Sequence, residues 1–197
     1  RLAARRDLDV QDNYRINLPN DLNRHPPLGI PSLGLTARPV REGDRVVVAV
    51  IDTAVQSDGT VLKDFLLPGI SVAGESTTPA ESLSHGTSMA TTILNGVAGS
   101  AASADGTPVR ILPVDVYGSG ESSSSFALAQ GIQAAILGGA DLVNLSLGGD
   151  GPSALVADVI RAGQAQGVVF VAAAGNEPVN TPTYPAAFPE VVAVTAM

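Results

Sequence analysis

The stretch RVVVAVIDT, residues 45–53, decides the fold because it predicts a buried strand that ends at an acidic residue. Six consecutive apolar residues, mostly β-branched Val and Ile, precede Asp52. Such a run is typical of a strand buried on both faces, as in a parallel sheet. Ligands of open α/β sheets bind outside the carboxyl ends of the strands, so Asp52 is expected at a functional edge. An isolated Asp here could equally cap a turn, and motifs further along the chain decide between the two interpretations.

The composition favours one globular domain built around a buried sheet. The chain has 197 residues, of which 45% are hydrophobic and 15% are charged, and 21 are Gly. This length allows one domain with a sizeable core but is short for two. The net charge of −8 argues against nucleic acid as a partner, because no cluster of Lys and Arg is available to neutralise phosphates.

The amino-acid composition also argues against a membrane span, cysteine chemistry and a transition-metal site. No apolar run approaches the roughly 18 residues of a membrane span. Residues 1–21 are charged and polar and show no signal peptide, and the chain begins with Arg rather than Met, which suggests earlier processing. The absence of Cys excludes disulfides, thiolate chemistry and Cys-ligated zinc. With two His residues and no clustered ligands, we expect no transition-metal site.

Two parts of the chain differ in character. Residues 1–44 contain several Pro, Asn and Gly residues and are expected to form an irregular lead-in that wraps the domain. Residues 45–197 alternate between apolar runs and helical patterns. We expect strands at residues 46–51, 69–73, 109–116, 141–145, 168–173 and 191–195, and helices that follow Ser84, Ser122–Ser125 and Ser153 and end near residues 97, 137 and 166. This order predicts an α/β fold with a doubly wound, mostly parallel sheet and helices on both faces.

In the first helix, Met89, Ile93 and Val97 recur at four-residue spacing. This spacing places them on one apolar face of the helix.

Polar residues of three types stand at the ends of these elements. Asp52 follows a strand, His85 opens a helix and Asn176 follows another strand. In hydrolysis by a serine nucleophile, a carboxylate orients an imidazole, and the imidazole carries the proton between the hydroxyl and the leaving group. A preorganised donor, which an Asn amide can supply, binds the oxyanion. The combination indicates hydrolytic chemistry.

Motifs around these residues resemble those of the subtilisin-like serine proteases. Residues 48–53 (VAVIDT) resemble the family's aspartate motif, and residues 84–87 (SHGT) resemble its histidine motif. Residues 143–149 (VNLSLGG) resemble the strand and wall of its primary specificity pocket, and residues 172–176 (AAAGN) resemble its oxyanion-hole motif. One such string alone is a weak indication, but four in the family's order are a strong one. The resemblance implies a subtilisin-like fold, here the N-terminal portion of a catalytic domain that is incomplete at its C-terminus.

The resemblance also assigns roles. Asp52 orients the base, His85 is the general acid and base, and Asn176 donates to the oxyanion. The implied substrate-binding residues are Ser146, Leu147, Gly148, Gly149, Ala173, Ala174 and Gly175. The substrate is a peptide or protein, and a secreted or periplasmic location is implied.

Peptide substrate is expected to lie extended as an added strand between two exposed edges. These edges are residues 145–149 and part of residues 118–124. The pocket walls consist mainly of small residues, which leaves room for a bulky apolar side chain before the scissile bond.

The nucleophile is where the pattern departs from the family. The family's Gly-Thr-Ser-Met-Ala motif follows the oxyanion Asn, but the 21 residues after Asn176 contain no Ser. The quintet occurs instead at residues 86–90, inside the histidine motif. Ser88 lies one helical turn from His85, so a contact is conceivable. The attacking oxygen must also face the oxyanion donor, however, and this favours a packing or surface role for Ser88.

We therefore expect the nucleophile Ser on a C-terminal segment outside this chain. A doubly wound sheet that lacks its last helices leaves an apolar face uncovered. Residues 1–197 are accordingly expected to need a C-terminal fragment of the same protein to be soluble and active.

No cofactor is certain, although calcium is possible by the resemblance. Residues 95–107 have a suitable general location, but they match no calcium-ligand motif, and Asp105-Gly106 is more simply a turn.

Other functions are compatible with parts of the pattern. A catalytically inactive subtilase-like binding or scaffolding module would share the fold and lack a working nucleophile. A nucleotide-binding α/β domain is disfavoured because no G-x-G-x-x-G or Walker-type string occurs.

Overall fold

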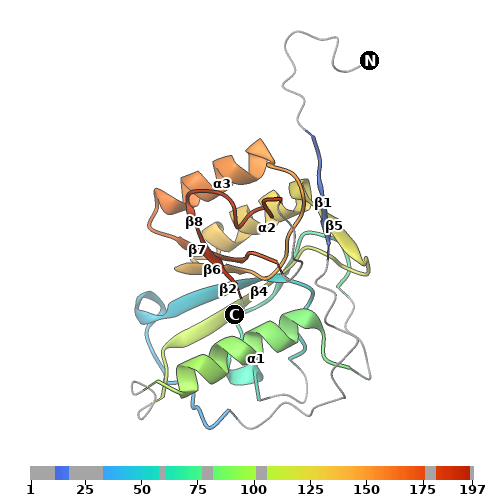
Figure 1. The fold of residues 1–197 in the computed structure, drawn as a ribbon. Helices are drawn as coiled ribbons and strands as arrows, with labels where there is room; N and C mark the ends of the chain where they lie inside the picture. Colours follow the sequence, from blue (N-terminus) through green and yellow to red (C-terminus); the bar gives the residue numbers. More distant parts are fainter. Residues whose placement is uncertain are drawn as a thin grey trace.

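The computed structural model describes residues 12–17, 33–57, 61–76, 82–100, 106–175 and 181–195. Its centre is a six-stranded sheet with the order β3-β4-β2-β6-β7-β8 (Figure 1). The strands are β2 (Val46–Asp52), β3 (Ile70–Ser71), β4 (Val109–Asp115), β6 (Leu142–Leu145), β7 (Val169–Ala173) and β8 (Val191–Val194). Every neighbouring pair in this sheet is parallel. The predicted parallel α/β sheet is confirmed, with each strand within a few residues of its expected bounds.

Three helices cover the two faces of the sheet. Helix α1 (His85–Ala98) lies on one face, and α2 (Ser125–Leu137) and α3 (Ala154–Gln164) lie together on the other (Figure 1). Each helix follows a Ser whose hydroxyl accepts a backbone N–H of the first turn, and these caps are Ser84, Ser124 and Ser153. Short polar side chains cap well because they satisfy N–H groups that the helix cannot pair.

Strand β2 separates two hydrophobic cores because its successive side chains point to opposite faces. Val47, Ala49 and Ile51 belong to the core under α2 and α3. Val48 and Val50 belong to the core under α1. The uninterrupted apolar run of β2 is thus explained by burial on both faces.

Met89 and Ile93 of the predicted apolar face of α1 pack against the core under this helix. Ala90, Thr91 and Leu94 are buried, whereas Met89, Ile93 and Val97 are only partly buried. A polar Thr can face the core here because the Thr91 hydroxyl donates to the Thr87 carbonyl 2.8 Å away. The hydrogen bond offsets the cost of burying the hydroxyl, so Thr91 can occupy a buried position.

A small two-stranded sheet ties the lead-in to the domain. Strand β1 (Arg15–Asn17) pairs antiparallel with β5 (Ser122–Ser124). The lead-in also contains a 3-10 helix, η3 (Glu42–Asp44), and a second one, η4 (Lys63–Phe65), follows β2. The sequence pattern did not predict β1 or β5, since three-residue strands with polar side chains carry no clear periodicity.

The face of the sheet that carries α1 is incompletely covered. Val48 pairs in register with Leu142 and Leu142 with Val169, so these residues share the face of α1. Val169 is 48% exposed on this face, and Val192 and Val194 of β8 are 55% and 52% exposed.

None of the helices in the described part of the chain has the length and hydrophobicity that a membrane span requires.

Candidate active site

The candidate site lies where the central strands end. Ile51 pairs with Leu145, and Leu145 pairs with Ala172. Asp52, Ser146 and Ala173, each one residue further along, therefore stand at the same edge of the sheet. This is the edge at which open parallel sheets bind ligands.

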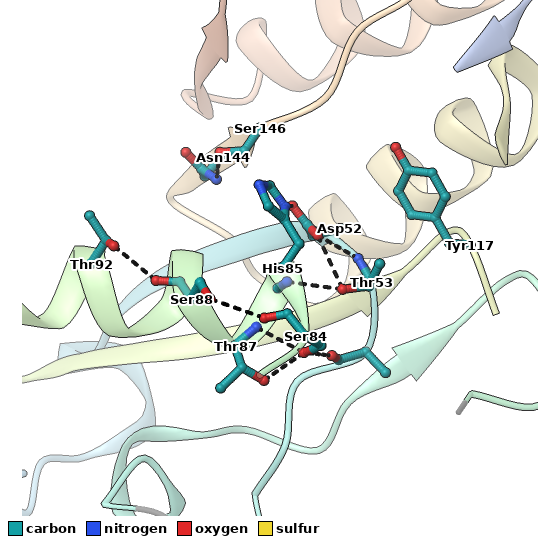
Figure 2. Close-up of polar contacts among 12 residues, drawn as sticks. Asp52, Thr53, Ser84, His85, Thr87, Ser88, Thr92, Tyr117, Asn144 and Ser146 are labelled. Carbon is teal, nitrogen blue, oxygen red and sulfur yellow. Dashed lines mark hydrogen bonds and ion pairs between the residues drawn. The ribbon is translucent and has the colours of Figure 1, made fainter. Parts of the chain in front are cut away.

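Asp52 and His85 form a buried hydrogen-bonded pair (Figure 2). The His85 Nδ1 lies 2.7 Å from the Asp52 Oδ2, and Asp52 is completely buried. The other carboxylate oxygen, Oδ1, accepts the Thr53 backbone N–H at 2.7 Å and the Thr53 hydroxyl at 3.3 Å. With Nδ1–H donating to the carboxylate, the neutral imidazole has its acceptor at Nε2. This arrangement can accept a proton from a hydroxyl and stabilise the imidazolium that results.

The loop after β2 holds the first turn of α1, and so holds His85. The Ser84 hydroxyl donates to the Ala54 carbonyl at 2.6 Å and accepts the Thr87 backbone N–H at 3.2 Å. The Thr53 hydroxyl accepts the Gly86 backbone N–H at 2.9 Å. These bonds join the helix to the two residues that follow Asp52, which fixes the imidazole relative to the carboxylate.

A second set of contacts reinforces the same junction. The Thr87 hydroxyl accepts the Gln56 backbone N–H at 2.8 Å. The Gln56 side-chain oxygen accepts the Ser84 backbone N–H at 3.1 Å. Thr87 and Ser84 are both buried, so their hydrogen bonds are shielded from competition with water.

Gly86 is required by the close approach of the helix to this loop. A Cβ at this position would lie 2.1 Å from the Thr53 carbonyl oxygen. Only Gly allows the backbone of α1 to pass so near to the backbone beside Asp52.

Tyr117 adds a buried phenol near the pair. Its hydroxyl donates to the Asn17 carbonyl at 3.1 Å. Burial raises the pKa of Tyr117 well above its ordinary value, and the negative charge of Asp52 raises it further. The hydroxyl thus stays protonated and remains a donor at any physiological pH.

The predicted substrate-binding residues after β6 lie beside the N-terminal strand. Asn17 donates its backbone N–H to the Gly148 carbonyl at 3.1 Å. Gly149 exchanges two backbone hydrogen bonds with Tyr184, each 2.9 Å long. The Ser146 hydroxyl accepts from the Asn144 side-chain amide at 2.9 Å (Figure 2). Leu147 is buried in the same core as Ile16, so its side chain forms part of the packing at this place.

The second predicted wall follows β7. Ala173 is half-buried, Ala174 and Gly175 are exposed, and the Ala174 N–H donates to the Val194 carbonyl at 2.8 Å. Gly175 has a φ of +97°, a conformation that favours Gly. Asn176 lies outside the described residues, so its role as oxyanion donor stays a prediction.

Ser88 is engaged away from the imidazole. Its hydroxyl donates to the Ser84 carbonyl at 3.2 Å, along the helix. In Figure 2 the His85 ring is directed toward Asp52, while the Ser88 hydroxyl lies beside the helix backbone. This geometry agrees with the expected packing role for Ser88.

The described part of the chain contains no group of three or more His, Cys, Asp or Glu side chains that could hold a metal ion. The region considered for calcium, residues 95–107, includes residues 101–105, which lie outside the described residues. The calcium suggestion therefore remains untested.

Sequence reasoning missed the residues that position the pair. Thr53, Gln56, Gly86 and Thr87 were not singled out for this function, and neither was Tyr117. Two of these residues carried a recognisable signal. Thr53 follows a buried Asp and Thr87 lies three residues after the cap Ser84, and a Thr at either place can hydrogen-bond to nearby backbone groups.

Comparisons with known proteins agree with the geometry. The model of the Subtilase family matches residues 43–197. Thermitase of Thermoactinomyces vulgaris is 34% identical over 163 residues, which are 80% of this chain and 57% of that protein. Subtilisin E of Bacillus subtilis (strain 168) is 38% identical over 165 residues, which are 79% of this chain and 42% of that protein. The chain thus spans about half the length of the curated relatives it matches.

Solved structures show the same similarity. The prenylagaramide maturation protease PagA matches with a TM-score of 0.56 and 25% identity, over 75% of this chain and 52% of that one. The psychrophilic subtilisin-like protease Apa1 from the Antarctic psychrotroph Pseudoalteromonas sp. AS-11 matches in fold, with a TM-score of 0.62 and 23% identity, over 75% of this chain and 35% of that one. With its parallel sheet, its buried Asp–His pair and a family match over most of its length, the chain belongs to the subtilase family.

Proposed function

We propose that this chain is the N-terminal part of a serine endopeptidase that hydrolyses peptide bonds in peptide or protein substrates. Asp52 orients the imidazole, and His85 transfers the proton between the nucleophile and the leaving amine. The observation that carries the proposal is the 2.7 Å contact between the His85 Nδ1 and the fully buried Asp52 carboxylate. A buried carboxylate bound to this nitrogen is what a general base of this type requires.

The nucleophile is a Ser on a segment C-terminal to Met197, and Asn176 supplies the oxyanion donor. Ser88 is not the nucleophile, because its hydroxyl is directed along α1 to the Ser84 carbonyl. Secretion or export to the periplasm is the expected location of such a protease.

The uncovered face of the sheet supports a C-terminal segment. Val169, Val192 and Val194 present three half-exposed apolar side chains on the face that α1 leaves free. Exposed apolar patches of this kind mark association surfaces. We assign this face to the C-terminal segment that carries the nucleophile, so the segment completes both the core and the site.

The test is active-site labelling of the full-length protein with a serine-reactive fluorophosphonate. Peptide mapping of the product is expected to locate the label on one Ser beyond Met197, and His85→Ala is expected to abolish labelling. Absence of labelling in a folded, full-length protein would assign the chain to the alternative, a catalytically inactive binding or scaffolding module. A label on Ser88 would refute the assignment of the nucleophile.

The dependence on a C-terminal segment has its own test. Residues 1–197 expressed alone are expected to associate or precipitate, and co-expression with the following segment is expected to restore solubility. Size-exclusion chromatography with mass detection checks this, and a stable, monodisperse monomer of 19.9 kDa would contradict it.

A further inference from the structure

Thr183, in the segment that precedes β8, lies between the two predicted walls of the substrate pocket. A Cβ on Gly148 would lie 2.5 Å from the Thr183 Cγ2, so this methyl group packs directly against the wall after β6. A Cβ on Gly175 would lie 3.4 Å from the Thr183 Oγ1, so the hydroxyl faces the wall after β7. One side chain is thus next to both walls and reaches across the space between them.

We propose that Thr183 forms the base of the pocket for the residue before the scissile bond and restricts that residue to a small side chain, such as Ala or Ser. This inference rests on the proposed protease function and adds the substrate class. It replaces the expectation of a bulky apolar side chain, which took only the small residues of the two walls into account.

Backbone hydrogen bonds fix the segment that carries Thr183. Tyr184 and Gly149 form an antiparallel bridge in which they exchange two hydrogen bonds, each 2.9 Å long. The Thr183 carbonyl accepts the Ala187 N–H at 2.9 Å. Thr183 is therefore attached to the wall after β6 by the residue that follows it.

Packing anchors the same segment to the core. Ala186 is buried in the core under α2 and α3, and Phe188 packs against that core. The Tyr184 and Phe188 rings lie 4.9 Å apart between their centroids, at an interplanar angle of 55°. Thr is also β-branched, and such side chains have restricted χ1 rotation. A large substrate side chain would have to displace a stiff residue on an anchored segment, which overpacked sites tolerate poorly.

The wall residues beside Thr183 leave the size of the pocket to this side chain. Gly148 and Gly175 contribute backbone alone, and the φ of +97° at Gly175 favours Gly at that position. Thr183 is half-buried, so part of its side chain remains accessible to a bound substrate. Its methyl and hydroxyl groups therefore set how large a substrate side chain can enter between the walls.

The experiment compares kcat/KM of the full-length protein for two peptide substrates that differ only in the residue before the scissile bond, which is Ala or Phe. The unmodified protein is expected to favour the Ala substrate at least about tenfold, since a single methylene in a pocket already changes kcat/KM about 10–200-fold. Thr183→Ala removes both atoms that face the walls. It is expected to raise the Phe-to-Ala ratio of kcat/KM at least about tenfold.

Two further variants separate pocket size from a structural role. Thr183→Val keeps the branched shape and removes only the hydroxyl, so it is expected to keep the exclusion of Phe. Thr181→Ala makes the same truncation as Thr183→Ala at an exposed side chain two residues away, and it is expected to leave the ratio unchanged. If Thr183→Ala does not fold, Thr183→Ser takes its place, because it removes only the methyl beside Gly148 and is expected to shift the ratio in the same direction.

An unmodified protein that cleaves the Phe substrate as well as the Ala substrate would refute the proposal. A folded Thr183→Ala protein in which kcat/KM falls equally for both substrates would also refute it, since a merely structural role has this effect. Fluorophosphonate labelling reports separately on the protease function. If the full-length protein does not label, that function fails, and the pocket is tested by equilibrium binding of two peptides that end in Ala or Phe. Tighter binding of the Ala peptide is then expected, and equal or tighter binding of the Phe peptide would overturn the role of Thr183.

Discussion

Replacement of Gly86 by Ala tests how the first turn of α1 is held against the loop after β2. The added Cβ would lie 2.1 Å from the Thr53 carbonyl oxygen and 3.1 Å from the Thr53 carbonyl carbon. Both atoms are backbone, so relief requires a shift of about 1 Å in the helix or the loop. Overpacking of this kind costs about 1–3 kcal/mol, and the better helix propensity of Ala offsets at most about 1 kcal/mol.

The net destabilisation expected for Gly86→Ala is about 2 kcal/mol, and the Tm should fall accordingly. Gly96→Ala is the matched control on the same helix, because no atom lies within 4 Å of its Cβ position. It is expected to stabilise the protein by about 0.5–1 kcal/mol. Thermal unfolding of the full-length protein, followed by circular dichroism, measures both changes.

The same displacement should affect chemistry. A misplacement of 1 Å between reacting groups can reduce a rate about 100-fold, so fluorophosphonate labelling of Gly86→Ala is expected to slow by about this factor. Gly96→Ala should label at the unmodified rate. If Gly86→Ala is as stable and as reactive as Gly96→Ala, the close approach of α1 to Thr53 does not position His85.

Three further predictions concern a cap, a phenol and the uncovered face. Ser84→Ala should lower the free energy of unfolding by about 1–2 kcal/mol in a denaturant titration, because it removes a buried helix cap and the hydrogen bond to the Ala54 carbonyl. The control is Ser100→Ala, which removes an exposed hydroxyl, and an equal effect of the two substitutions would contradict the prediction. Above the ordinary tyrosine pKa of 10.0, the unfolded chain releases a proton that the folded protein keeps on Tyr117, so stability should fall by up to about 1.4 kcal/mol per pH unit. Tyr117→Phe should flatten this alkaline slope, and an unchanged slope would refute the burial argument. The Val192 side chain is 55% exposed in the described chain, and we expect the C-terminal segment to cover it. Val192→Asp should then lower the free energy of unfolding of the full-length protein by more than about 1 kcal/mol, whereas a neutral effect would place the segment elsewhere.

The central architecture was predictable because its signals are local and repeated. The apolar run before Asp52 and the Ser caps at Ser84 and Ser153 each arise from backbone hydrogen bonding or burial that operates within a few residues. Placement of Asp52 at the functional edge followed from topology, since parallel strands end at a common edge.

The rest depends on contacts between distant segments, which a single sequence does not encode in a visible pattern. Pairing of Ile16 with Ser123 joins residues more than a hundred positions apart and leaves no periodicity in either strand. The role of Gly86 likewise becomes visible only when the Thr53 carbonyl is in place.

The most direct test of the central claim, that Asp52 and His85 act as one proton-transfer unit, is the rate of fluorophosphonate labelling of Asp52→Asn in the full-length protein. The substitution keeps the size of the side chain but lets its amide disfavour the tautomer in which Nδ1 donates. The account predicts a fall in rate of about 10⁴-fold with the fold retained, as in other triads. Labelling of folded Asp52→Asn at the unmodified rate would contradict it.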